Sequence, residues 1–74
     1  MSGYVPKPSD QEWTRGFLSM VADGAIWVTS FAVYTVDKSH KTLRVQEVLP
    51  DGVSVAPMER VAAVFKSIGW EVVE

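Results

Sequence analysis

One short segment of this chain brings together several side chains that are suited to chemistry. Lys38, Lys41 and Arg44 are three of the seven lysines and arginines, and His40 is the only histidine. Cations gathered in this way can bind phosphate or an acidic partner. The sequence therefore marks Lys38, His40, Lys41 and Arg44 as a candidate anion-binding group, with a solvated turn as the competing interpretation.

Catalysis is the weaker interpretation of these residues. General acid–base chemistry needs a positioned partner and a pocket, whereas the pattern around His40 predicts an exposed turn. The chain has no cysteine and its glycines are scattered, so it lacks a thiolate metal site and a phosphate-binding loop. The sequence predicts no catalytic residue, no metal ligand and no cofactor, and it favours a protein that is not an enzyme.

Size and charge restrict the partners. A chain of 74 residues makes one small domain whose core is marginal, and without disulfides the remaining source of stability is association. The net charge of −2 disfavours nucleic acid as the main partner. No secretory signal is evident, and the longest uncharged run is too short to span a bilayer. These features predict a cytoplasmic protein that does not contact membranes and forms a homo-oligomer or binds another protein.

The first third of the chain predicts one helix. Ser9 and Glu12 have the spacing of a capping box, and apolar side chains then recur at helical intervals. These signals predict a helix over 10–23 that ends at Gly24. Residues 1–8 contain two prolines and no apolar period, so a flexible N-terminal arm is expected there, followed by a single domain over 9–74.

Strands and a second helix are predicted after Gly24. The uncharged run 25–37 and the run 42–49 are rich in strand-forming residues and are expected to pair as a hairpin. Pro57 suits the first turn of a helix, which Gly69 would end with Trp70 packed back onto Phe65. Residues 70–73 complete the order α-β-β-α-β as a short strand.

This order predicts an α+β fold, a two-layer α/β sandwich with both helices on one face of the sheet. A helical crossover makes the second and third strands parallel. They are expected to lie on either side of the first strand, in the strand order 2-1-3. The sheet would then have three strands, with 25–37 in the centre. The order resembles small split βαβ domains in general, a likeness of architecture that implies no activity.

The run 25–37 is apolar on both faces, and the helices of one chain can cover only one of them. Pairing Asp37 with Thr42 places Ala32 opposite Glu47 on the covered face. On the open face it predicts an apolar patch formed by Trp27, Phe31, Val33, Val48 and Val73. A β-bulge near Ser30 would exchange Trp27 for Ile26 and Val28.

The sequence therefore predicts a small interaction module that forms a homodimer through the open face of its sheet, since a two-fold interface needs only one self-complementary patch. Two alternatives remain: a nucleic-acid or acidic-partner binder that uses the basic hairpin tip (Lys38–Arg44), and a small-molecule site or enzyme at a subunit interface.

Overall fold

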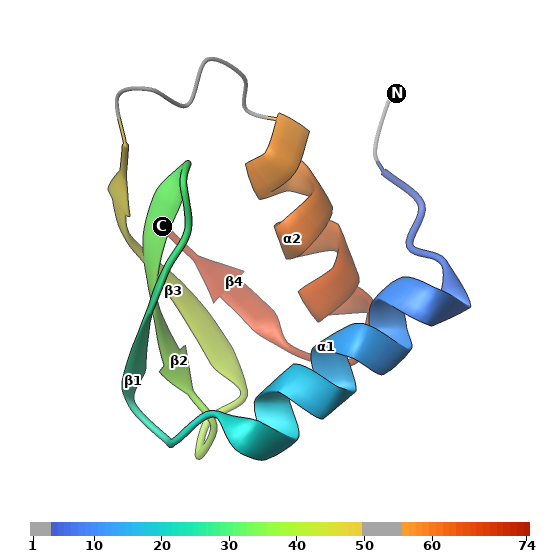
Figure 1. The fold of residues 1–74 in the computed structure, drawn as a ribbon, viewed down its shortest axis with the longest axis horizontal. Coiled ribbons are helices and arrows are strands. Elements are labelled where there is room, and N and C mark those ends of the chain that lie inside the picture. Colours follow the sequence, from blue (N-terminus) through green and yellow to red (C-terminus); the bar gives the residue numbers. More distant parts are fainter. Residues whose placement is uncertain (1–3, 50–55) are drawn as a thin grey trace.

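The computed structural model describes residues 4–49 and 56–74. The elements are α1 (Pro8–Met20), β1 (Ala25–Val28), β2 (Ala32–Asp37), β3 (Thr42–Val48), α2 (Ala56–Ser67) and β4 (Glu71–Val73). The strands form one four-stranded sheet in the order β1-β2-β3-β4, in which only the β3–β4 pair is parallel. Both helices lie on the same side of the sheet (Figure 1). The predicted α+β class is confirmed.

The predicted three-stranded sheet and its strand order 2-1-3 are wrong. The run 25–37, predicted as one strand, folds back on itself as the two strands β1 and β2. β1 therefore pairs with the edge of β2 at which the prediction placed the last strand. The last strand, β4, pairs with β3 instead, with Leu43 opposite Val72. The crossover through α2 thus joins two neighbouring parallel strands, which is the usual geometry of such a connection.

A hydroxyl group builds the turn between β1 and β2. Thr29 Oγ1 accepts hydrogen bonds from the backbone N–H groups of Phe31 and Ala32, at 3.3 and 2.9 Å, and donates to the carbonyl of Ala32 at 2.7 Å. Local bonds of this kind give the backbone an alternative to the sheet ladder. The strand therefore stops at Val28 and restarts at Ala32.

The β2–β3 hairpin follows the predicted register at its tip and departs from it farther away. Asp37 lies opposite Thr42 as expected, but the register shifts between Val33 and Tyr34. Val33 consequently lies opposite Glu47, and Ala32 lies opposite Val48. One extra residue on β3 moves the residues beyond it by one place, which reverses the face that each of them occupies.

Helix α1 begins and ends earlier than predicted. Pro8 is its first residue, and the Asp10 carboxylate accepts a hydrogen bond from the Lys7 backbone N–H at 3.1 Å, so Asp10 takes the part predicted for Glu12. The second helix ends as predicted. The N–H of Trp70 donates to the carbonyl of Phe65 at 3.0 Å past Gly69, whose φ of 94° is left-handed, and the two rings meet edge to face.

The core lies between the helices and the sheet. Its buried apolar residues come from α1 (Leu18), β2 (Ala32, Tyr34, Val36), β3 (Leu43) and α2 (Val64, Phe65). Burial of a side chain the size of leucine or phenylalanine contributes about 1.5–3 kcal/mol. The opposite face of the sheet contributes none of these residues, so it is available to form a surface.

Candidate functional surfaces

The face of the sheet opposite the helices carries two rows of side chains across three strands. We call this surface the open face. Its central positions are Ile26 and Val28 on β1, Thr35 and Val33 on β2, and Arg44 and Glu47 on β3, with Ile26, Thr35 and Arg44 in one row and Val28, Val33 and Glu47 in the other. Val73 on β4, opposite Arg44, extends the first row. Ile26 is 60% exposed and Val28 is 66% exposed. The apolar corner of the open face therefore lies on β1 and β2.

Three of the five residues predicted for the open face lie on the helix side. Trp27 pairs with Tyr34 and stacks on its ring, with ring centroids 5.1 Å apart. Phe31 packs edge to face on the same tyrosine. Val48 lies opposite the buried Ala32. The turn at Thr29 places Trp27 and Phe31 on the helix side instead of the predicted face, and the register shift in β3 does the same for Val48.

The other two predicted residues lie on the open face. Val33 is half-buried in the row that contains Val28, and Val73 lies opposite Arg44 on β3. The sequence predicted Ile26 and Val28 on the open face only in the case of a β-bulge near Ser30. Thr29 and Ser30, two turn-forming hydroxyl residues inside the apolar run, were the signal that could have identified them.

The β3 column of the open face carries one charge of each sign. Arg44 and Glu47 are both exposed, and neither forms an ion pair with another described residue. Glu47 was expected on the helix-covered face, and the register shift places it on the open face instead. Between them, the Gln46 side chain donates to Thr35 Oγ1 at 2.8 Å and ties β3 to β2.

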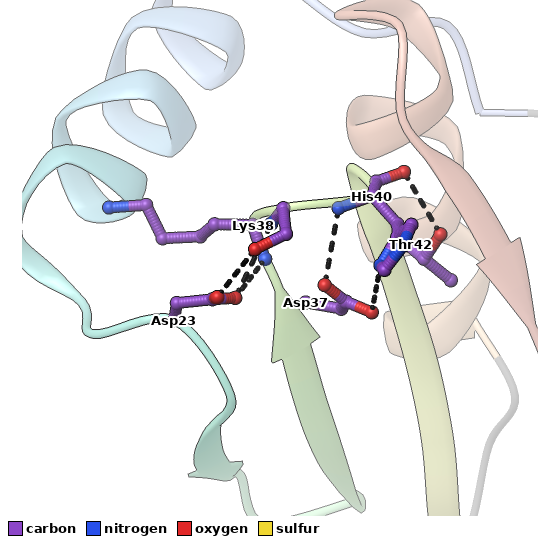
Figure 2. Close-up of polar contacts among 6 residues, drawn as sticks. Asp23, Asp37, Lys38, His40 and Thr42 are labelled. Carbon is purple, nitrogen blue, oxygen red and sulfur yellow. Dashed lines mark hydrogen bonds and ion pairs between the residues drawn. The ribbon is translucent and has the colours of Figure 1, made fainter.

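At the hairpin tip, a carboxylate organises the loop between β2 and β3. Asp23 accepts hydrogen bonds from the Ser39 hydroxyl and from the backbone N–H groups of Lys38 and Ser39 (Figure 2). These bonds, that of the Ser39 hydroxyl first, hold the pKa of the Asp23 carboxyl below its usual value. The Lys38 ammonium donates to the carbonyl of Val21 at 3.0 Å, at the negative end of α1.

The four predicted anion-binding residues do not form one group. The His40 ring lies 2.9 Å from the Asp37 carboxylate, which also accepts the His40 backbone N–H (Figure 2). Lys41 is exposed, with a left-handed φ of 51°. Arg44 lies on the open face, and Lys38 is bound to the end of α1. The cations at the hairpin tip thus lie beside two carboxylates and the C-terminal end of α1. The tip is therefore not a concentrated positive patch.

On the helix side, a chain of aromatic rings runs from the surface to the core. Trp13, which is 61% exposed, stacks on Phe17 with ring centroids 5.4 Å apart, and Phe17 contacts Trp27 at 4.7 Å. Trp27 then reaches Tyr34 at 5.1 Å and Phe65 at 6.1 Å. A cavity of about 280 Å³ opens between these rings and the two helices.

The described part of the chain holds no group of three or more histidine, aspartate or glutamate side chains placed to bind a metal ion. Among the described helices, none has the length and apolar character needed to cross a membrane. Comparisons with known proteins give no match, whether with family models, curated proteins or solved structures. Function is therefore inferred from the surfaces of the protein itself.

Proposed function

We propose that this protein is a non-enzymatic interaction module whose partner is a second copy of itself, docked through the open face. The observation that carries the proposal is the arrangement of the two rows. Each row has an apolar residue on β1 and a charged residue on β3, and the two charges are opposite. A surface of this kind is complementary to itself.

A two-fold axis that runs across the strands, between the two rows, makes this complementarity explicit. Each residue of one row then faces the other row of the second copy. Ile26 meets Val28 of the second copy, and Arg44 meets its Glu47, each contact occurring twice. Facing sheets pack at about 10 Å with their strands nearly aligned, which suits branched side chains of this size.

The size of the apolar corner indicates a weak dimer. Ile26 and Val28 are well exposed and can each gain on the order of 1 kcal/mol from burial, while an ion pair at a partly exposed interface contributes about 1 kcal/mol or less. Stable interfaces bury about 1,200–2,000 Å² in total with about 20–30 residues on each side, and the six central positions of the open face are fewer than that. Summed over both copies, these contributions stay below the roughly 8 kcal/mol that a micromolar constant requires, so we expect a dissociation constant on the order of 100 micromolar or weaker.

A charge exchange tests the proposed contact directly. Arg44→Glu or Glu47→Arg alone places like charges opposite each other and should weaken self-association about tenfold, because two like pairs replace two opposite pairs. The double variant R44E/E47R restores both pairs and should recover the wild-type constant. Sedimentation equilibrium measures the change between 8.2 kDa and twice that mass.

Ile26→Glu should abolish association while leaving the fold intact, because the side chain is exposed in the single chain. Met20→Glu is the matched control: Met20 is 85% exposed on α1, away from the open face, and its substitution should leave the association constant unchanged. A monomer at all concentrations, or a double variant no better than the single ones, would contradict the proposal.

A further inference from the structure

The helix side of the sheet holds a second surface that self-association does not use. The cavity of about 280 Å³ lies among α1, α2 and the β1–β2 turn. Its walls include the aromatic side chains of Trp13, Trp27, Phe31 and Phe65. The cavity is on the side of the sheet opposite the open face, so docking of a second copy there leaves it accessible.

We propose that this cavity binds a planar aromatic acid of one or two fused rings. Small-molecule sites are mostly apolar, with a few polar groups that orient the ligand, and typical volumes begin near 300 Å³, so this cavity suits a small ligand. Four aromatic walls favour a flat ring, because rings stack in offset or edge-to-face geometry. The buried Thr14 also lines the cavity and adds a polar residue to its otherwise mostly apolar wall.

The charged side chains in the lining of the cavity decide between an acid and an amine. Arg60 lines the cavity and is exposed, and its guanidinium lies 4.7 Å from the centre of the Tyr4 ring in a cation–π contact. Arg60 makes no ion pair with a described carboxylate, so its donors can receive a ligand carboxylate.

Asp10 also lines the cavity, but its carboxylate is already engaged. It accepts hydrogen bonds from the Tyr4 hydroxyl and from the Lys7 backbone N–H. These bonds, with the charge of Arg60 as a smaller contribution, hold the pKa of Asp10 below its usual value. Neutral donors bind the Asp10 carboxylate, whereas Arg60 forms no ion pair with a described carboxylate. Of the two charged side chains in the lining, Arg60 therefore has the donors to bind a ligand carboxylate, which favours an anionic ligand.

Titration with three probes that share one ring system tests the proposal: naphthoate, naphthylmethanol and naphthylmethylamine. The indole N–H signals of the three tryptophans serve as the readout in NMR spectra of the full chain. Naphthoate should shift the signals of Trp13 and Trp27, which line the cavity, and leave that of Trp70, which does not. Its affinity should exceed that of the neutral alcohol about tenfold, as a charge-assisted hydrogen bond provides.

Arg60→Gln should remove this tenfold preference while leaving the affinity for the alcohol unchanged. Arg60 is exposed, so the substitution does not disturb the core. Arg15→Gln is the matched control, because Arg15 is exposed on α1 and does not line the cavity. The proposal is overturned if naphthoate shifts none of the signals at millimolar concentration, if Trp70 shifts as much as Trp27, or if the alcohol or the amine binds as tightly as the acid.

Discussion

At the scale of single residues, Asp23 shows how one exposed carboxylate connects distant parts of the chain. It follows α1 by three positions, yet it receives three hydrogen bonds from the β2–β3 loop. Those bonds favour the charged form and lower the pKa of the carboxyl from its usual 3.8. A group with a lowered folded pKa stabilises the protein above its unfolded pKa, and this contribution is lost as the pH falls through the folded pKa.

Asp23→Ala should therefore lower the free energy of unfolding at pH 7, and the difference from wild type should close as the pH falls through the lowered pKa of Asp23. Urea unfolding at a series of pH values measures the loss of stability at pH 7 and its decrease at low pH. Ser39→Ala removes the strongest donor and should raise the pKa of Asp23 in an NMR titration. An equal loss of stability at pH 7 and pH 2 would show that the carboxylate acts through packing rather than charge.

Tyr34 presents the opposite case, a buried polar group to which no other described residue bonds. The residue is 1% exposed, its hydroxyl has no hydrogen-bond partner within residues 4–49 and 56–74, and burial raises its pKa to about 12. An unsatisfied buried hydroxyl costs about 1–3 kcal/mol. Tyr34→Phe should therefore leave the free energy of unfolding unchanged or raise it by about 1 kcal/mol in urea unfolding.

The same substitution should alter the response to alkaline pH. Above pH 10.0 the unfolded tyrosine ionises while the buried one stays neutral up to about 12, so the wild type loses stability as the pH rises through this interval. The advantage of the phenylalanine variant should grow over the same range. If Y34F is instead less stable by more than about 1 kcal/mol, the hydroxyl has a partner in solution.

At the scale of elements, the two-sided apolar run is explained by a turn. As a single strand, residues 25–37 would place Trp27 and Tyr34 on opposite faces, because seven positions separate them. The turn at Thr29 restarts the alternation, and both rings then face the helices. Within each of the two short strands, successive side chains alternate between the two faces of the sheet. The run appeared apolar on both faces only because β1 and β2 were treated as one continuous strand.

Thr29→Ala should remove the hydrogen bonds that its hydroxyl makes with Phe31 and Ala32 and lower the free energy of unfolding by about 1–2 kcal/mol. Ser30→Ala is the matched control, because no described group bonds to the Ser30 side chain, and its effect should stay within about 0.5 kcal/mol. Chemical denaturation measures both. Equal effects of the two substitutions would mean that turn composition, rather than the Thr29 hydroxyl, sets the strand boundary.

What the sequence could predict at this scale follows from how local each signal is. The hairpin register beside Asp37 and the end of α2 at Gly69 depend on a few neighbouring residues, and both were predicted correctly. The turn at Thr29 and the extra residue in β3 interrupt patterns that are otherwise continuous. Each such slip reverses the faces beyond it, so Trp27, Phe31 and Val48 were assigned to the wrong side.

At the scale of the whole molecule, self-association and folding are linked. Among the residues that the structure describes, seven apolar ones are buried in the core, which is a small core for a folded domain. A partner that binds only the folded chain raises its stability by mass action. The melting temperature of the wild type should therefore rise as the protein concentration passes through the dissociation constant.

Ile26→Glu should show a melting temperature that does not depend on concentration, since this variant cannot dock. Differential scanning calorimetry at several concentrations makes the comparison. A wild-type melting temperature that stays constant over a hundredfold range of concentration would indicate that folding is complete within one copy.

The two borders of the sheet differ in a way that limits how far it can grow. β1, Ala25–Val28, carries no charge, whereas β4 and the residue after it include Glu71 and Glu74. Uncharged borders accept an added strand, and charged ones resist it. If two copies were to pair edge to edge through their β1 strands, both free edges of the joined sheet would be the acidic β4 strands. Growth would then stop at a closed pair, and the protein would be protected from forming fibrils.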